Sequence, residues 1–324
     1  MTLADDADLS AAELSAADIA WDLDPLLGGR SIDALLDEAD AIATELEGAR
    51  GTVADLDAGA LADFMDRFAG LQDVLGRAGN WASLRFAVDT ADEARGAAVQ
   101  RVQERATAVF NRLIFFELEW AALSDERVEE LLADERLTTA RHYLRSARRY
   151  RPHLLTEPEE RLIADKRVTG AAAWSRLFNE LTSAITVELP DESGDVRSAP
   201  LEEGLSQLSH PDRAVRRTAA SAVTEGLGPG LRTRAFLFNT LVADKATDDR
   251  LRRYDSWLAS RNLANEASDA SVQALVEAVV GRYDIARRWY RLKASILGLD
   301  RLADYDRMAS VSSSEIFLSE SRRI

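Results

Sequence analysis

The side chains best suited to metal or nucleophilic chemistry are scarce in this sequence. Its 324 residues include no cysteine and three histidines, His142, His153 and His210. Without cysteine, thiol catalysis, disulfides and cysteine-based zinc sites are excluded. Two histidines that share one zinc ion on a helix stand four positions apart, as in HExxH. Because the three histidines are at least eleven positions apart, the sequence contains no such pair.

Each histidine has a simpler interpretation than a catalytic one. His142 and His153 lie in and after a basic helical stretch, where they could form a metal pair. Solvated or helix-capping roles are favoured, because a helix C-terminus stabilises a nearby imidazole. His210, between Ser209 and Pro211, is interpreted as a turn residue, since no nucleophile signature accompanies it.

Other candidate groups can be weighed in the same way. One basic run comprises Arg145, Arg148, Arg149 and Arg151. This arginine run could bind a phosphate or a carboxylate, but we favour a solvated helix face that pairs with acidic residues. Segment 226–230 is rich in glycine but lacks the Lys-Ser/Thr ending of a phosphate loop, which favours a turn between helices. Four tryptophans at apolar helix positions are predicted to be core residues: Trp81, Trp120, Trp174 and Trp289.

A polar string between two amphipathic helices is the most distinctive candidate for binding. It runs through 252–257 and 261–266 and is rich in arginine, asparagine, tyrosine and serine. Connecting segments with such side chains often line clefts. Two interpretations, a cleft lining and ordinary surface structure, stay open at this point.

Composition limits the classes of partner. Forty basic residues against 56 acidic ones give a formal charge of −16. Such a charge disfavours binding to nucleic acid or to anionic membranes. The longest apolar segment, 109–123, carries Asn111, Arg112, Glu117 and Glu119, so it is not a membrane span. The acidic start of the chain is unlike a signal peptide, so we expect a cytoplasmic protein.

The elements that must position these residues are predicted to be mainly α-helical. Apolar residues recur at helical spacing in 31–47, from 60 through 75, through 81–86, and in 90–123, 156–170, 171–184, 201–208, 212–225, 231–254 and 271–297. Capping boxes are predicted at 90–93 and 156–159. In 171–184 we expect four apolar side chains to point inward: Trp174, Leu177, Phe178 and Leu181. The alternating segment 185–189 and its return over 196–198 predict one β-hairpin.

Two long segments resemble a known family. Segment 148–189, with its Trp174-x-x-Leu-Phe-x-Glu-Leu stretch and hairpin, is similar to the N-terminal helical region of oligoendopeptidase F-type zinc metallopeptidases, relatives of thimet oligopeptidase. Segment 232–306 resembles the opening of the peptidase domain in the same family. The resemblance covers about residues 20 to 310 and fades near Met308.

The resemblance implies an architecture. It predicts a helical lobe over 21–198 that ends in the hairpin and the incomplete start of a zincin-type peptidase domain over 199–310. The Ala- and Asp-rich composition of 1–20 predicts a flexible lead, and the loss of similarity and helical pattern predicts a divergent tail over 311–324. The family hydrolyses short peptides inside a channel between two helical halves. We therefore expect substrate contacts from four residues of the polar string: Tyr254, Ser256, Arg261 and Asn262.

The family's chemistry cannot be carried over in the same way. Zinc is its expected cofactor, held by an HExxH helix and a downstream glutamate, and this chain contains no such motif. No catalytic residue or metal ligand is therefore assigned, and the chain is expected to be inactive alone. The alternative is a non-catalytic helical scaffold that binds peptides or partners. A shortened chain is also expected to expose an apolar surface through which it can self-associate.

Overall fold

The computed structural model describes residues 21–191 and 193–311, which form two compact units. The described parts of the first unit are 21–52 and 59–113, and those of the second are 53–58 and 114–311 apart from residue 192. The expected lead (1–20) and nearly all of the expected tail (312–324) lie outside the described residues. The expected domain boundary near residue 198 stays a prediction.

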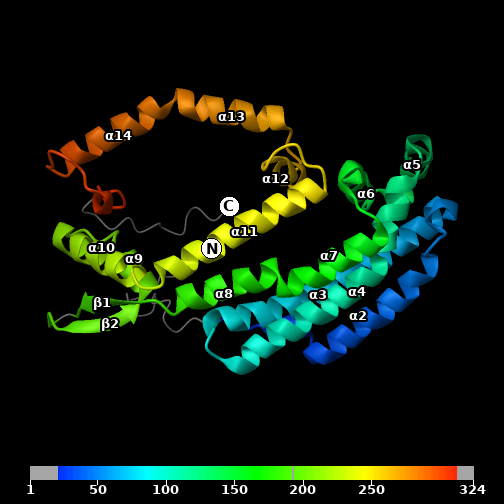
Figure 1. Ribbon diagram of the computed structural model, residues 1–324, viewed down its shortest axis with the longest axis horizontal. Helices are drawn as coiled ribbons and strands as arrows, with labels where there is room; N and C mark the ends of the chain where they lie inside the picture. Colours follow the sequence, from blue (N-terminus) through cyan, green and yellow to red (C-terminus); the bar gives the residue numbers. More distant parts are fainter. Residues whose placement is uncertain (1–20, 192, 312–324) are drawn as a thin grey trace, which may run out of the picture. The chain divides into compact units, whose positions relative to one another are not determined.

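The first unit is helical (Figure 1). Its elements are α1 (Asp24–Leu27), α2 (Ile32–Leu46), most of α3 (Ala58–Val88) and the first two thirds of α4 (Glu93–Ala122). The predicted start of α2 is confirmed, because the Ser31 hydroxyl accepts the Ala34 N–H at 3.1 Å. The predicted apolar face of α2 is buried: Ile32, Leu35, Leu36, Ala39, Ile42 and Leu46. Arg105 of α4 pairs with Asp37 and Asp40 at the rim of this core.

Two details of the first unit differ from expectation. The runs expected from 60 and through 81–86 are one continuous helix, α3, which accommodates Gly76 and Gly79 in its interior. The expected capping box, with Thr90 as the capping residue and Glu93 as its partner, was wrong. Asp92 caps α4 instead, because its carboxylate accepts the N–H groups of Ala94 and Arg95 at 2.8 and 3.1 Å. A carboxylate directly before the first turn reaches these orphan donors.

The second unit continues α4 and adds shorter helices and the hairpin (Figure 1). Its further elements are α5 (Asp125–Leu132), α6 (Arg141–Arg148), α7 (Glu157–Thr169), α8 (Ala171–Ser183), β1 (Thr186–Pro190), β2 (Val196–Pro200), α9 (Leu201–Gln207), α10 (Arg213–Leu227), α11 (Leu231–Leu251), α12 (Ala259–Ala264), α13 (Asp269–Gly281) and α14 (Tyr283–Ile296). The expectation of a mainly α chain with one hairpin is confirmed. No helix among the described residues combines the length and apolarity that a membrane crossing requires.

Several local predictions for this unit are also confirmed. Glu159 accepts the Thr156 N–H at 2.9 Å, as the capping box at the start of α7 requires. The two strands pair antiparallel with Val187 opposite Ala199. The hairpin is not isolated, because buried residues of β1, β2, α9 and α10 share one small core. The glycine-rich segment 226–230 is the end of α10 and its turn into α11.

Three expectations about the second unit were wrong. On α8, Leu177, Phe178 and Leu181 are each more than a third exposed, so that face is only partly covered. Trp289 on α14 is likewise exposed, whereas Trp120 is fully buried as predicted. The helix expected over 271–297 is two helices, because the chain leaves helical geometry at Arg282. Helical spacing indicates an apolar face but does not supply the neighbour that covers it.

Candidate functional site

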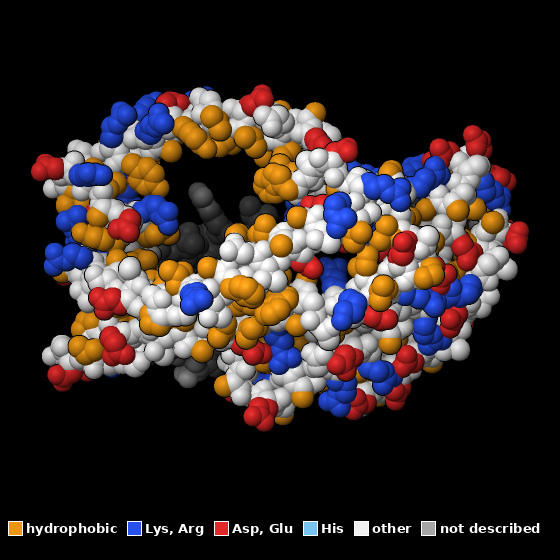
Figure 2. Space-filling view, viewed as in Figure 1, with side chains coloured by type: hydrophobic (Ala, Val, Ile, Leu, Met, Phe, Trp, Pro, Cys, Tyr) orange, Lys and Arg blue, Asp and Glu red, His pale blue; other side chains and the backbone are white. Residues whose placement is uncertain are grey.

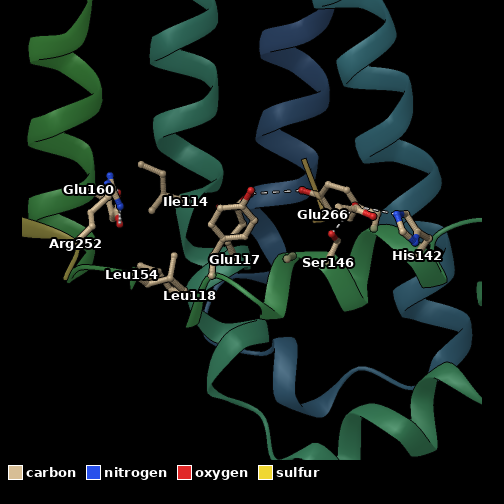
Figure 3. Close-up of a pocket in the computed structure, with 12 residues that line it drawn as sticks. Ile114, Glu117, Leu118, His142, Ser146, Leu154, Glu160, Arg252 and Glu266 are labelled. Carbon is tan, nitrogen blue, oxygen red and sulfur yellow. Dashed lines mark hydrogen bonds and ion pairs between the residues drawn. The ribbon is translucent and has the colours of Figure 1, made fainter. Parts of the chain in front are cut away.

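The second unit contains a cavity of about 540 Å³ between helices that lie far apart in the sequence. Its residues come from α4, from α6 and the segment after it, from α7, and from the segments that flank α12 (Figure 3). They are Ile114, Glu117, Leu118, His142, Tyr143, Ser146, Ala147, Tyr150, Leu154, Glu160, Arg252 and Glu266. Cavities of this volume with mostly apolar walls and a few polar groups are typical of small-ligand sites.

Hydrogen bonds hold α6 against the end of α4 and so shape the cavity. The Trp120 indole N–H donates to the Leu144 carbonyl at 2.8 Å. In return, Arg148 donates to the carbonyls of Trp120 and Leu123 at 2.7 and 2.9 Å, and Arg151 donates to Ala121 at 2.8 Å. These carbonyls lie at the C-terminal end of α4. The last carbonyls of a helix lack N–H donors from a following turn, and the two guanidinium groups supply donors instead.

The arginine run is therefore structural as well as solvated. The predicted pairing with carboxylates is present, because Arg145 pairs with Glu129 at 2.7 Å and Arg148 with Asp125 at 2.5 Å. The capping of α4 by two of these guanidinium groups is a role that the sequence pattern did not indicate.

The Glu117 carboxylate is the most unusual group in the cavity. Its nearest polar partner is the Tyr143 hydroxyl, which donates to it over a long 3.5 Å. No ion pair of Glu117 is found in the described ranges. Glu117 is exposed, but partial desolvation of its carboxylate, together with the nearby Glu160 charge, raises the pKa of Glu117, although Tyr143 and Arg252 act in the opposite direction. Burial and the Glu117 charge raise the pKa of Tyr143.

Glu160 and Arg252 form the opposite kind of arrangement at the edge of the cavity. Two N–H groups of Arg252 donate to the two carboxylate oxygens of Glu160, each at 2.8 Å. Glu160 also accepts the Leu155 N–H at 3.0 Å. Burial opposes the charge, but the Arg252 hydrogen bonds and the Leu155 N–H prevail and lower the pKa of Glu160. Arg252 is thus fully engaged inside the protein.

The remaining polar groups of the cavity are bonded to one another. Glu266, which follows α12, accepts the Ser146 hydroxyl at 2.7 Å and lies 2.9 Å from His142 Nε2 (Figure 3). The Ser146 hydrogen bond and His142 lower the pKa of Glu266. Glu266 adopts a left-handed backbone conformation (φ 54°), which a non-glycine residue seldom takes.

A second cavity, of about 670 Å³, adjoins the first and shares Tyr150, Leu154 and Arg252 with it. Its further polar lining includes Lys166, Lys245, Asp248, Tyr254 and Ser260. The Tyr254 ring stacks on His153 with centroids 3.9 Å apart, and His153 Nδ1 lies 2.9 Å from the Arg252 carbonyl. The polar string thus contributes residues to both cavities.

The four residues that the resemblance predicts as substrate contacts lie in different settings. Tyr254 lines the second cavity. Ser256 and Arg261 are exposed, and neither is among the residues that line these two cavities. Asn262 is buried and donates to Asp269 at 2.7 Å, which ties α12 to the start of α13. Their contact with substrate stays a prediction.

Glu117 and Tyr143 were not among the predicted site residues. The only signal for Glu117 in the sequence is its place in a largely apolar helical segment, 109–123, which carries three other polar residues as well. That Tyr143 and Glu160 face this glutamate depends on how α6 and α7 pack on α4.

The histidines do not fit a zinc centre. His142 is bonded to Glu266, His153 to the Arg252 carbonyl, and His210 Nδ1 accepts the Asp212 N–H at 3.0 Å. Across residues 21–191 and 193–311, no three histidine or acidic side chains are grouped closely enough to hold a metal ion. No step through zinc is therefore derived for the residues described.

The segment that builds most of the first cavity matches a known family. A sequence model described as Oligopeptidase F matches residues 119–186, which include seven of the cavity's lining residues, from His142 to Glu160. The chain is related to the oligopeptidase F family. It is 26% identical over 215 residues to group B oligopeptidase PepB of Streptococcus agalactiae, which covers 64% of this chain and 35% of PepB. It is 24% identical to oligopeptidase PepF of Bacillus subtilis, with 72% of this chain and 35% of PepF covered.

The chain therefore spans about a third of the length of these oligopeptidase F relatives. The crystal structure of oligoendopeptidase-F from Enterococcus faecium has a similar fold, with a TM-score of 0.76 at 21% identity. That similarity covers 88% of this chain and 55% of the crystallised one. The predicted mainly helical fold of the oligoendopeptidase F type is confirmed.

Proposed function

We propose that this chain handles short peptides as the helical portion of an oligopeptidase F-type enzyme. The observation that carries the proposal is the coincidence of the family match, 119–186, with the segment that forms the walls of the first cavity. The two adjoining cavities offer hydrogen-bonding groups and apolar walls along one side of α4, α6 and α7. Peptides present both backbone amides and side chains to such a surface.

We further propose that these 324 residues do not hydrolyse peptides alone. Zinc-dependent hydrolysis requires ligands that converge on one ion, with an open position for water. This sequence has three histidines, none within ten positions of another, and each has a different partner in the structure. The proposed contribution of this chain is therefore binding and not bond cleavage.

Two measurements on the purified chain test these proposals. Isothermal titration with tripeptides and tetrapeptides tests binding, and saturable binding is expected. An internally quenched peptide assay with added zinc, paired with elemental analysis, tests inactivity. Stoichiometric zinc together with turnover that survives further purification would overturn the proposed inactivity. Absence of any peptide binding would overturn the proposed function.

A partner-binding scaffold is the second candidate, because apolar side chains are exposed on α13 and α14. Hydrophobic side chains gather along these helices in Figure 2. The exposed residues are Leu275, Val276, Val279, Val280, Tyr283, Ile285, Trp289, Tyr290, Leu292 and Ile296. Large exposed apolar patches are typical of protein interfaces or of association. Light scattering at increasing concentration distinguishes the two candidates. Self-association, which we expect, would favour a portion of a larger enzyme, whereas a stable monomer would favour the adapted scaffold.

A further inference from the structure

We propose that the cavity around Glu117 binds the N-terminal ammonium group of a short peptide together with an apolar first side chain. This inference rests on the proposed peptide-handling function and specifies which end of the peptide is held. It assigns Glu117 as the group that pairs with the ammonium.

The charge of the cavity favours a cation. Three carboxylates line it, Glu117, Glu160 and Glu266, against a single guanidinium, Arg252. Arg252 is already bound bidentately by Glu160 and pairs with Asp248 at 3.1 Å, so it has little capacity to bind an anionic ligand. A carboxylate of a ligand would meet uncompensated negative charge here, whereas an ammonium would be stabilised.

Glu117 is the carboxylate that lacks a strong partner. Glu160 has Arg252, and Glu266 has Ser146 and His142, at distances of 2.9 Å or less. Glu117 has the Tyr143 hydroxyl at 3.5 Å, beyond the usual range of a good O–H···O bond. Glu117 is exposed, so a ligand can reach its carboxylate, and groups with perturbed pKa values are concentrated at functional sites. An ammonium donates up to three hydrogen bonds and would supply the missing charge.

The walls next to Glu117 are apolar. Ile114 lies one helical turn before it on α4, Leu118 follows it directly, and Leu154 lies near Leu118 (Figure 3). Ala147 also lines the cavity. In a peptide, the first side chain is attached one carbon away from the ammonium nitrogen. An apolar first residue therefore places its side chain against these walls while its ammonium faces the carboxylate. A volume of about 540 Å³ accommodates this residue and part of the next.

The test compares two peptides and two variants of the full 324-residue chain by isothermal titration. The peptides are Leu-Ala-Ala-amide and its N-acetylated form, in which a neutral acetamide replaces the ammonium. We expect acetylation to weaken binding roughly tenfold to a hundredfold, the range for a hydrogen bond between charged groups. In Glu117→Gln this difference between the peptides should disappear. Glu104→Gln, an exposed glutamate on the same helix, should retain it.

The outcomes separate this inference from the proposed function. Equal binding of both peptides to the unchanged chain overturns the ammonium site but leaves peptide handling intact. Absence of binding by either peptide overturns both. A third peptide, acetyl-Ala-Lys-Ala-amide, carries its ammonium on a side chain; if it binds as tightly as Leu-Ala-Ala-amide, the assignment to a peptide N-terminus is overturned. Circular dichroism of each variant verifies that it is folded.

A pH series gives a second readout. The groups that face Glu117 are Tyr143 from α6, Glu160 from α7, Arg252 after α11, and the His142–Glu266 pair. Protonation of Glu117 removes the charge that attracts the ammonium. Affinity for Leu-Ala-Ala-amide should therefore fall as the pH decreases through the raised pKa of Glu117, and the affinity of Glu117→Gln should show a smaller change over the same interval. An identical profile for both proteins would contradict the proposal.

Discussion

Two carboxylates of the second unit, the buried Asp306 and the exposed Glu117, differ in the partners that compensate their charge. Asp306, in the short 3-10 turn Asp304–Asp306, is completely buried and is bound by two arginines of α10. Arg213 donates to it at 2.9 Å and Arg216 at 3.0 Å, and the Ala303 N–H adds a third bond at 2.9 Å. Glu117 has one long hydrogen bond from a neutral hydroxyl.

The difference is reflected in the direction of the two pKa shifts. Burial alone would raise the pKa of Asp306, but the bonds from Arg213, Ala303 and Arg216 lower it well below its usual value. For Glu117 partial desolvation prevails and the pKa is raised. A carboxylate with its cations already in place holds the fold together, whereas one without them is available to a ligand. The following changes test this distinction.

Loss of the Asp306 charge should have the largest effect on stability. Asp306→Asn leaves Arg216 buried without its counter-charge, and removal of one partner from a buried pair costs about 3–5 kcal/mol. Chemical denaturation measures this loss, with Asp304→Asn, an exposed neighbour, as the control. Because the pKa of Asp306 is lower in the folded state, its contribution is present above the unfolded pKa and is lost as the pH falls through the folded one. An unchanged denaturation midpoint would contradict a structural role.

Glu160→Gln should have an intermediate effect. Its bidentate bond with Arg252 is partly shielded from solvent, and hydrogen bonds to charged groups contribute about 1.5–3 kcal/mol. A double-mutant cycle with Arg252→Gln isolates the interaction between the two side chains. Strictly additive losses would show that the pair contributes nothing beyond its separate contacts.

Glu117→Gln should change stability in the opposite direction. Because the pKa of Glu117 is raised on folding, the folded state holds its proton more tightly, and the ionised carboxylate destabilises the fold once the pH exceeds the unfolded pKa. At neutral pH the variant should therefore be slightly more stable, by less than about 1 kcal/mol, because Glu117 is exposed and solvent screens much of the effect. At a pH low enough to protonate the carboxyl in both states, the two proteins should denature together. A variant that is less stable at neutral pH would contradict this comparison.

Glu129→Gln provides the smallest expected change. Its pair with Arg145 leaves both side chains more than half exposed, so solvent and salt screen the attraction. We expect a change within about 0.5 kcal/mol in thermal or chemical denaturation. A loss as large as that of Glu160→Gln would mean that the number of cationic partners and their burial do not determine the contribution of a carboxylate in this protein.

Local features of the sequence predicted much of the fold. The helix start at Ser31, the Thr156–Glu159 box, the turn at 226–230 and the hairpin at 185–198 each depend on residues within a few positions of one another. Their hydrogen bonds form wherever the rest of the chain lies. Even here, a neighbouring residue can take the capping role: Asp92, and not Thr90, caps the start of α4.

The candidate site was much less predictable. For the polar string, the sequence left a cleft lining and ordinary surface structure open, and in the structure Arg252, Tyr254 and Glu266 line the two cavities. The partners of these residues were not foreseeable, since Arg252 binds a glutamate 92 positions earlier and Glu266 a serine 120 positions earlier. Helical spacing on α8 and α14 likewise predicted apolar faces but not that Leu177 and Trp289 would be exposed.

By itself, the sequence determined where many of the helices begin and end, which faces are apolar, and that no two histidines can share a metal ion along one helix, because each of these depends on short spacings or on an inventory of residues. Only the tertiary structure decided which apolar faces are covered and which carboxylates receive a cation. Those outcomes depend on helices that meet across long stretches of chain, where burial changes the free energy of a charge by amounts that no local pattern encodes.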